Sequence, residues 1–316
     1  MTGTAVKNGW NLADAPDLHG KVAIVTGATG GLGYETALGL ARRGATTIVA
    51  GRNPDKGARA LSRIRRDLPA ATVRFEMLDL ASLASVVRFA AAVTAAQDGV
   101  IDILVNNAGV MGMPRRRLTE DGFEQQIGVN YLGHFALTAR LKDALRAAPG
   151  GGRVVSVASL AHRRAALDLD DPQSERSYSP MRAYGRSKLA MLVFAIELQR
   201  RAERNQWNLR SIAAHPGWAR TEIIGNGMGG GAPGIKEWVI AQAFGLVAQS
   251  ARDGALPSLY AAMAPAAKGG AYYGPTGPGE TRGAPGVSRI SPQAADPAVG
   301  NRLWSLSEKL TGLTFN

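Results

Sequence analysis

A tyrosine and a lysine stand four positions apart in AYGRSKLA, residues 183–190. Positions i and i+4 share one face of an α-helix, so Tyr184 and Lys188 are expected to lie side by side. A phenol beside an ammonium group can exchange protons with a bound molecule, because the positive charge stabilises the phenolate. The same spacing also suits a surface pair. The chemistry therefore depends on whether other elements bring a reacting group to these side chains.

A glycine-rich turn, TGATGGLG (26–33), follows a buried apolar strand expected at 21–26 and precedes a helical pattern. Gly27 allows a tight turn, Gly31 lets a pyrophosphate approach the backbone, and Gly33 permits close packing of the helix. The helix N-terminus would then face the phosphates. Such a turn is often only a tight connection, but its place between a first strand and a helix favours a dinucleotide site. The contacts expected from it, in part through backbone alone, are Gly27, Thr29, Gly30, Gly31, Leu32 and Gly33.

The end of the second strand indicates which nucleotide binds. An NAD site usually offers an acidic residue about twenty residues beyond the glycines. Here the strand expected at 46–50 runs into Gly51, Arg52 and Asn53, without a carboxylate. Arg52 can hold a 2′-phosphate through bidentate hydrogen bonds. NADP(H) is therefore predicted over NAD(H), although an exposed loop arginine is the alternative in so basic a chain.

Further strands are expected at 72–78, 101–107, 153–159 and 209–215, each separated from the next by a helical pattern. This alternation predicts a single-domain Rossmann fold, an α/β architecture with a doubly wound parallel sheet and helices on both faces. In such a sheet the first and fourth strands flank the ligand crevice. The turn after the fourth strand, NNAG (106–109), is thus predicted to share the crevice with the glycine-rich turn.

We expect one domain over residues 20–316, preceded by an N-terminal segment, 1–19. The Gly-rich stretch GNGMGGGAPG (225–234) indicates a hinge in a substrate-binding lid over 222–250. In a C-terminal extension, 268–316, GGAYYGPTGPGETRGAPG predicts an irregular surface loop. A last helix is expected to begin at Asp296-Pro297, since aspartate favours the N-cap and proline the first helical position. Its docking residues would be Leu303, Leu306 and Leu310.

The composition excludes several classes of protein. The 316 residues are 45% hydrophobic and 20% charged, with no cysteine, which rules out disulfides and thiolate chemistry; no metal site is expected. No run reaches the eighteen or so apolar residues of a membrane span, and no signal peptide is evident, so we expect a cytoplasmic protein. The net charge is +12. Because the arginines are scattered and no nucleic-acid motif accompanies them, the charge favours a polyanionic cofactor over nucleic acid.

In order along the chain, TGATGGLG, NNAG, the asparagine of VNYLGHF, a serine after the fifth strand, YGRSK and HPGWART resemble the short-chain dehydrogenase/reductase family. The resemblance covers about residues 20–225. DGFEQQIGVNYLGHFALT, VASLAH and the long gap between Ser159 and Tyr184 are similar to its retinol-dehydrogenase-like and WW-domain-oxidoreductase-like branch. The family implies an oxidoreductase that interconverts a carbonyl compound and its alcohol by hydride transfer. Together with Arg52 and the apolar residues near the cofactor, it predicts NADP(H) as the cofactor and a hydrophobic aldehyde or ketone as the substrate.

The resemblance also implies a role for each catalytic residue. Tyr184 would be the general acid or base at the substrate oxygen, with Lys188 binding the nicotinamide ribose and lowering the tyrosine pKa. Ser159 would hold the substrate oxygen, and Asn130 would support a water link to the lysine. Ser156 is a second candidate for the serine but suits a strand residue better. His134 is expected to be a packed helix residue rather than a catalytic one.

The remaining cofactor contacts follow from the same resemblance. Asp79 resembles an adenine contact, although a cap of the next helix is nearly as good an interpretation, and Thr221 would bind the nicotinamide carboxamide. The further contacts are Leu80, Asn107, Ala108, Gly109, Pro216 and Gly217, together with Tyr184 and Lys188. An apolar substrate pocket, or alternatively core or dimer surface, is predicted from Met111, Met113, Ile223, Ile224, Trp238 and Val239.

Two other functions remain open from the sequence. A sugar-nucleotide epimerase or dehydratase of the extended family also uses tyrosine and lysine at this spacing, but NNAG argues against it. A non-catalytic NADP(H)-binding sensor or scaffold protein would be expected to lose Tyr184 or Lys188. Relatives pair through the helices that carry Asn130 and Tyr184, so a homodimer or homotetramer is possible, and the long tail would either block or reinforce that contact.

Overall fold

The computed structural model describes residues 9–219 and 249–315 of the chain. These residues form one eight-stranded sheet with the strand order β3-β2-β1-β4-β5-β6-β7-β8. The strands are β1 Val22–Thr26, β2 Thr46–Gly51, β3 Val73–Met77, β4 Ile103–Asn106, β5 Gly152–Val157, β6 Leu209–Ala214, β7 Tyr272–Pro275 and β8 Pro285–Val287. All neighbours pair in parallel except β7 and β8, which are antiparallel. The predicted doubly wound sheet is confirmed, with each of the six predicted strands in place.

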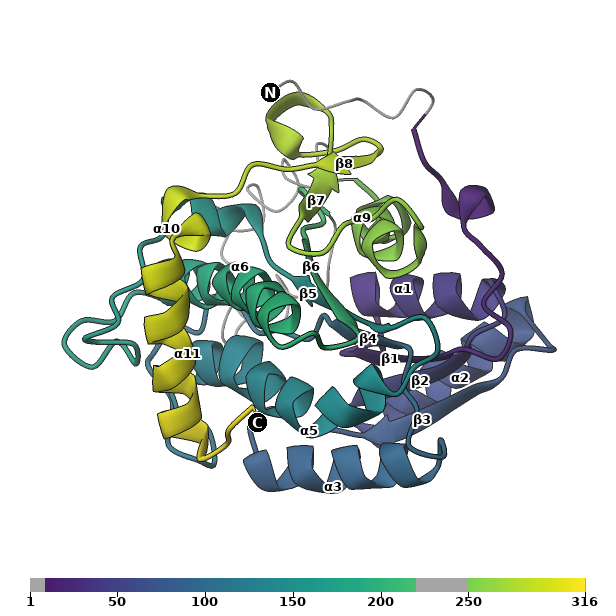
Figure 1. Cartoon of the computed structure of the whole chain (residues 1–316), viewed down its shortest axis with the longest axis horizontal. Helices are drawn as coiled ribbons and strands as arrows, with labels where there is room; N and C mark the ends of the chain where they lie inside the picture. Colours follow the sequence, from purple (N-terminus) through teal and green to yellow (C-terminus); the bar gives the residue numbers. More distant parts are fainter. Residues whose placement is uncertain (1–8, 220–248, 316) are drawn as a thin grey trace, which may run out of the picture.

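Helices cover both faces of the sheet (Figure 1). One apolar cluster lies under α3, α5, α6 and α11, and a second lies under α1, α2 and α9. The helical segments are η1 Leu12–Asp14, α1 Gly31–Arg42, α2 Pro54–Asp67, α3 Leu83–Ala95, α4 Gln125–Ile127, η2 Gly128–Leu132, α5 Gly133–Arg146, η3 Leu160–Arg164, α6 Pro180–Arg204, α9 Ala251–Met263, η4 Pro278–Glu280, α10 Pro292–Ala295 and α11 Pro297–Thr311. Because both faces are buried, the strands read as continuous apolar runs rather than as alternating patterns.

The sheet reverses its winding direction beside β1, which pairs with β2 on one side and with β4 on the other. Helices that follow β1 and β4 leave on opposite faces, so their first turns separate at the carboxyl ends of these strands. A crevice opens at such a point in doubly wound sheets. The fold therefore places the glycine-rich turn after β1 beside the NNAG turn after β4, as predicted.

The prediction of an irregular surface loop over residues 269–286 is wrong. This segment holds β7 and β8, and β7 extends the sheet by pairing in parallel with β6. Tyr272 and Tyr273 are buried on opposite faces of the sheet, one in each apolar cluster. Glycine and proline favour turns locally, but β6 would otherwise present unpaired backbone groups, and pairing with a distant segment satisfies them. The local composition carries no sign of that partner.

The predicted last helix is confirmed. α11 begins at Pro297, and the Asp296 carboxylate accepts a hydrogen bond from the Ala298 amide at 2.8 Å. Leu303 is buried and Leu310 packs against the same cluster, but Trp304 is the main anchor, with its ring 1% exposed and 5.3 Å from the ring of Phe135. α11 therefore covers the outer face of α5 and α6.

Part of the N-terminal segment packs onto the domain as well. Trp10 is buried with an edge-to-face contact to Tyr260 of α9, at 5.4 Å between ring centroids. Ala15 and Leu18 join the same apolar cluster. Across residues 9–219 and 249–315, no helix combines the length and apolar character that crossing a bilayer requires.

Candidate active site

A cavity of about 1010 Å³ opens at the carboxyl ends of the central strands. Its size is at the upper end for ligand sites and suits a dinucleotide with a substrate beside it. Nearly all the predicted site residues line it. They are Gly27, Thr29, Gly30, Gly31, Leu32, Gly33, Arg52, Asp79, Leu80, Asn107, Ala108, Gly109, Ser159, Tyr184, Lys188, Pro216 and Gly217. Asn130 lies just behind the cavity wall, and Thr221 lies outside the described residues.

The glycine-rich turn has the shape that a pyrophosphate requires. Gly27 has φ +66°, and a β-carbon there would come within 2.9 Å of the Ala108 α-carbon. Gly31, at φ +54°, has nothing within 4 Å of its β-position, which leaves open space at the cavity surface. α1 begins at this residue, so its first amide groups are free of partners inside the helix. Backbone donors and open space at a helix N-terminus fit an anion.

The two turns form one continuous rim because Thr26 connects them. Its hydroxyl oxygen accepts hydrogen bonds from the amides of Asn107 and Ala108, both at 2.9 Å. In return, the Asn107 side-chain amide donates to the Thr26 carbonyl at 2.8 Å. A β-carbon at Gly33 would lie 2.5 Å from that same amide nitrogen, so only glycine lets α1 approach so closely. The turns after β1 and β4 are therefore held as a single unit.

At the far end of the cavity, Arg52 is accompanied by a second cation that the sequence reasoning missed. Lys56 lines the cavity from the first turn of α2, where the Asn53 side chain caps the helix by accepting from the Lys56 amide at 2.9 Å. Lys56 could have been found from the sequence, because Pro54 sets the start of α2 and a residue in the first turn of that helix lies next to Arg52. Both side chains can contact a phosphate.

Asp79 does not cap α3, so the alternative interpretation of this residue is wrong. Ser82 is the N-cap and accepts from the Ser85 amide at 3.3 Å. The Asp79 carboxylate instead accepts from the Ala81 amide at 2.9 Å, in a turn that keeps the residue on the cavity wall. This position fits the predicted contact with an adenine ring.

α6 places Tyr184 and Lys188 on one face, as their spacing predicts. Both are buried, with 7% and 4% of their surface exposed, and both line the cavity. The Lys188 ammonium donates to the Val157 carbonyl at 3.0 Å and lies 6.0 Å from the centre of the Tyr184 ring. Tyr184 is also hydrogen-bonded to the Ser159 side chain. A surface pair is therefore excluded.

The protonation of this pair differs from the sequence-based expectation. Burial raises the pKa of Tyr184, although the hydrogen bond to Ser159 opposes this, whereas the proximity of Lys188 was predicted to lower it. Burial also lowers the pKa of Lys188 to about 8. The reason is desolvation, which disfavours the charged form of each group and, at Tyr184, outweighs the effect of Ser159. The phenol is accordingly protonated at neutral pH.

Asn130 lies in a π-helical turn, η2, that the sequence did not predict. Its side chain accepts from the Val110 amide at 2.7 Å and donates to the Val110 carbonyl at 2.9 Å and to the Ser187 hydroxyl at 2.8 Å. A β-carbon at Gly109 would lie 3.2 Å from the Asn130 oxygen and 3.4 Å from the Lys188 nitrogen. Single π-turns are frequent at functional sites. Here the turn fixes the segment that follows NNAG beside the lysine.

His134 and Ser156, the two other candidates for a catalytic role, have structural roles instead. His134 is fully buried, with its ring nitrogens bonded to the Thr26 hydroxyl at 2.9 Å and to the Asn130 carbonyl at 2.9 Å. Burial lowers its pKa to about 3, so the ring is neutral. Ser156 is buried within β5, away from the cavity. Ser159 instead lies between β5 and η3, and its hydroxyl caps η3.

The end of the cavity away from Arg52 contains residues that the sequence reasoning did not find. They come from η3, the start of α6, the turn after β6 and the loop between β7 and β8: Leu160, Ala161, Arg163, Arg164, Met181, Trp218, Ala219, Gly279 and Thr281. Met111 lines the cavity as predicted, but Met113 does not, and its carbonyl accepts from the Tyr178 hydroxyl at 2.8 Å. Ile223, Ile224, Trp238 and Val239 lie outside the described residues, with most of the predicted lid.

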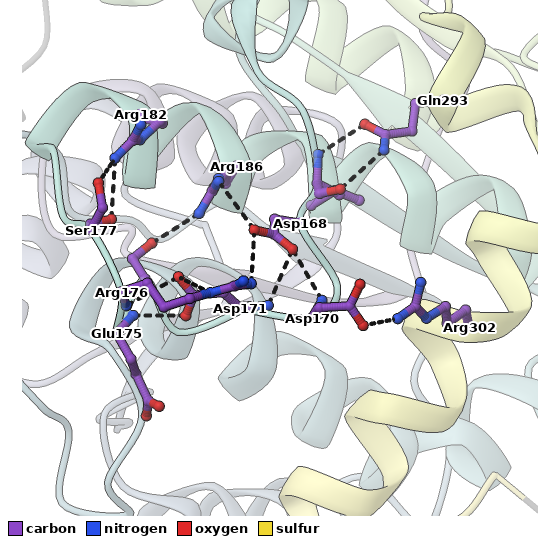
Figure 2. Close-up of polar contacts among 12 residues, drawn as sticks. Asp168, Asp170, Asp171, Glu175, Arg176, Ser177, Arg182, Arg186, Gln293 and Arg302 are labelled. Atoms are coloured by element: carbon purple, nitrogen blue, oxygen red, sulfur yellow. Dashed lines mark hydrogen bonds and ion pairs between the residues drawn. The ribbon is translucent and has the colours of Figure 1, made fainter.

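Between Ser159 and Tyr184, the long gap is an ordered segment beside α11. Asp168 pairs with Arg176 at 3.3 Å and with Arg186 at 4.0 Å (Figure 2). The Asp171 carboxylate accepts from the amide of Glu175 at 2.7 Å. None of these five residues lines the cavity. We call Asp168, Asp171, Arg176 and Arg186 the outer network.

Comparisons with known proteins agree with this geometry. Residues 21–227 match the family model described as short chain dehydrogenase. A mouse protein named polyprenol dehydrogenase is 41% identical over 307 residues, which cover 94% of this chain and 85% of the relative. Human retinol dehydrogenase 13 is 41% identical over 299 residues, covering 94% of this chain and 86% of the relative.

Among solved structures, an uncharacterised protein from Mycobacterium paratuberculosis superposes with a TM-score of 0.80 at 38% identity, covering 98% of this chain and all of that protein. The similarity therefore extends through the C-terminal strands and α11. The retinol-dehydrogenase-like branch predicted from DGFEQQIGVNYLGHFALT and VASLAH is confirmed.

Proposed function

We propose that this chain, which belongs to the short chain dehydrogenase family, interconverts a hydrophobic aldehyde or ketone and its alcohol with NADP(H). The observation that carries the proposal is the convergence of Ser159, Tyr184 and Lys188 on the same cavity as the glycine-rich turn. A nucleotide bound along that turn would reach these three side chains.

When bound, the nicotinamide cofactor supplies the hydride for reduction and accepts it for oxidation. Ser159 and Tyr184 hold the substrate oxygen between their hydroxyl groups. In reduction, the Tyr184 phenol donates its proton to that oxygen, and the raised pKa of Tyr184 keeps the phenol protonated beforehand. Lys188 binds the ribose, and Asn130 positions the backbone next to the lysine for the water link by which the phenol regains its proton.

NADP(H) is favoured over NAD(H) by the charges at the nucleotide end. Arg52 and Lys56 both line the cavity there, and residues 50–53 offer no carboxylate for the ribose hydroxyls. Two cations suit a 2′-phosphate, because Arg can bind two of its oxygens while Lys adds a point charge.

A hydrophobic substrate is supported by the apolar side chains at the other end of the cavity. Leu160 and Met111 line it, and Met181 and Trp218 stand at the same end with 55% and 41% of their surface exposed. Large apolar side chains that are left open to solvent together, on one face, often mark a binding site. Two relatives are named for retinol and polyprenol, which are apolar alcohols.

Any homodimer or homotetramer would use a surface other than the outer face of α5 and α6. α11 covers that face within the same chain, with Trp304 packed against both Phe135 and Phe194. This cover favours the alternative in which the tail blocks the contact through which relatives were expected to pair.

The test follows NADPH oxidation with a panel of aldehydes and ketones of increasing size, with NADH as the parallel cofactor. Tyr184→Phe should abolish turnover and leave NADPH affinity nearly unchanged. Tyr260→Phe, a buried tyrosine in α9 away from the cavity, is the matched control and should keep full activity. If Tyr184→Phe also loses NADPH binding, the assigned role is wrong. If the wild type binds NADPH but reduces no carbonyl compound, a non-catalytic sensor becomes the better interpretation.

A further inference from the structure

The substrate end of the cavity is walled by segments that are far apart in the sequence. η3 follows Ser159 directly, residues 216–219 follow β6, and Gly279 and Thr281 belong to the loop between β7 and β8. Glu280 stands between the last two, and it is the residue at which all three segments meet. No role in the mechanism above requires this carboxylate.

The Glu280 side chain is bonded to both other segments. One of its carboxylate oxygens accepts from the Arg163 guanidinium of η3 at 2.6 Å and from His215, at the end of β6, at 3.0 Å. The Gly217 amide donates to the other ring nitrogen of His215 at 3.1 Å, so a neutral ring carries its proton on the nitrogen that faces Glu280. A single carboxylate thus joins the turn after Ser159 to the turn at Pro216-Gly217.

Glu280 is ionised in this arrangement. Burial opposes its charge, but hydrogen bonds from His215 and Ser288 and the positive charge of Arg163 outweigh burial and lower its pKa to about 2. His215 remains neutral because burial lowers its pKa more than the bond to Glu280 raises it. The contact with Arg163 is therefore a true ion pair, and side-chain exposures of 33% for Arg163 and 22% for Glu280 leave it only partly screened.

The backbone at this point is held in an unfavourable conformation. Glu280 has φ +58°, in the left-handed region, which costs a non-glycine residue on the order of 1 kcal/mol. Such a conformation persists where surrounding contacts determine it, and it concentrates at functional sites. The neighbouring Thr281 carbonyl accepts from the Trp218 amide at 2.8 Å, which fixes the loop against the cavity rim.

We propose that Glu280 is a positioning residue that sets the width of the substrate end. By holding the β7–β8 loop against Arg163, it keeps Gly279 and Thr281 in the cavity wall that also contains Leu160, and thereby selects substrates by breadth. The inference rests on the proposed carbonyl reduction, and it adds the element that determines which carbonyl compounds fit.

Glu280→Gln is the first test, because the amide keeps a hydrogen-bond acceptor for His215 but loses the ion pair. With unbranched aldehydes, KM should rise about tenfold while kcat changes less than threefold. With broad branched or polycyclic aldehydes, KM should stay the same or fall. NADPH affinity should change little, because the amide still accepts from His215 and so leaves the Pro216-Gly217 turn in place, and Arg52, Lys56 and the glycine-rich turn are untouched. Arg163→Met should reproduce this pattern, and Arg163→Lys should restore most of it because the charge remains.

The outer network provides the matched control. Asp168→Asn makes the same change from carboxylate to amide at a partly exposed side chain, 37% against 22% for Glu280, that also pairs with two partners (Figure 2). It should lower the melting temperature without changing the ratio of KM values for narrow and broad substrates.

The outcomes separate the two proposals. A wild type that reduces aldehydes, with a Glu280→Gln variant that keeps the wild-type KM ratio, overturns the inference alone. Equal changes in KM for narrow and broad substrates, or the same pattern in Asp168→Asn, overturn it as well, because a general loss of stability would then explain the data. A wild type inactive on the whole panel overturns the proposed function and this inference with it. If Glu280→Gln does not fold, the Arg163→Met and Arg163→Lys pair decides the question.

Discussion

The two ends of the cavity are built in different ways. The nucleotide end consists of short contiguous stretches, 26–33, 50–56, 78–80 and 107–110, each at the carboxyl end of a strand, and its shape comes mainly from backbone and absent side chains. The substrate end is built from side chains between Leu160 and Thr281, held together by contacts such as the Arg163–Glu280 ion pair. Rigid backbone tolerates little change, whereas a wall of side chains from separate segments can be altered piece by piece. The nucleotide end should therefore respond steeply to substitution and the substrate end gradually.

The largest effect is expected at Gly31. Valine there would project into the open space at the cavity surface, and NADPH affinity should fall at least about a hundredfold, or about 3 kcal/mol. Gly99→Val is the control, since Gly99 has a similar φ of +75° and open surroundings but lies outside the cavity. Both variants should lose similar thermal stability, and only Gly31→Val should lose NADPH binding in a fluorescence titration. Unchanged NADPH binding in Gly31→Val would contradict the expectation that the nucleotide end is the more sensitive of the two to substitution.

Arg52 should produce the next largest effect, confined to the phosphorylated nucleotide. Arg52→Ala removes a charge-assisted contact worth about 1.5–3 kcal/mol, so the Kd for NADPH should rise roughly 10- to 100-fold while the Kd for NADH hardly changes. Lys56→Ala should cause a smaller loss in the same direction. Titrations of both variants with both nucleotides provide the measurement. An equal loss for NADPH and NADH would mean that these cations do not bind a 2′-phosphate.

Lys188 joins the two ends, and its titration should appear in the pH profile. Its pKa is lowered from 10.5 to about 8, so the ammonium is present below about pH 8 and is lost above it. The kcat/KM for NADPH-dependent reduction, which reports the free enzyme, should therefore fall about tenfold per pH unit above that point. The same shift affects stability. Below pH 8 the buried ammonium lowers the free energy of unfolding, and this penalty shrinks as the pH rises from 8 towards 10.5. Lys188 should therefore not reduce stability in that range. A flat profile up to pH 10 would show that the ammonium is not required.

The smallest effect is expected at Met181, which lines the substrate end of the cavity. Truncation by Met181→Ala removes apolar surface worth about 1 kcal/mol if a substrate covers it, so KM for hydrophobic aldehydes should rise about fivefold. Met77→Ala is the control, because Met77 is similarly exposed, at 59% against 55%, but does not line the cavity. Steady-state kinetics should separate the two variants. A rise in KM of a hundredfold or more in Met181→Ala would show that the substrate end is as sensitive to substitution as the nucleotide end.

Most of the nucleotide end could be predicted from the sequence because its determinants are local. A glycine that must turn after a strand, or a proline that begins a helix, acts on its own neighbours and leaves its mark in a few consecutive residues. Lys56 was within reach of the same reasoning, since Pro54 fixes the turn in which it lies. The pairing of Tyr184 with Lys188 belongs to this class as well, because helix geometry alone brings them together.

Other features have no local signature. Residues 269–286 read as a loop, yet they form β7 and β8, because the free edge of β6 supplies a hydrogen-bonding partner more than fifty residues away. The pKa of Tyr184 rises instead of falling, since only the packed structure determines how much water reaches the phenol. The π-turn at Asn130 likewise depends on bonds to Val110 and Ser187.

By itself, the sequence determined the order of strands and helices through β6, the glycine-lined turn after β1, the place of Arg52 after β2 and the pairing of Tyr184 with Lys188, because each follows from residues close together in the chain. Only the tertiary structure decided β7 and β8, the protonation of that pair, the covering of α5 and α6 by α11, and the meeting of Arg163, His215 and Glu280. Desolvation and contacts between distant segments exist only once the chain has folded, and the selection among substrates depends on them.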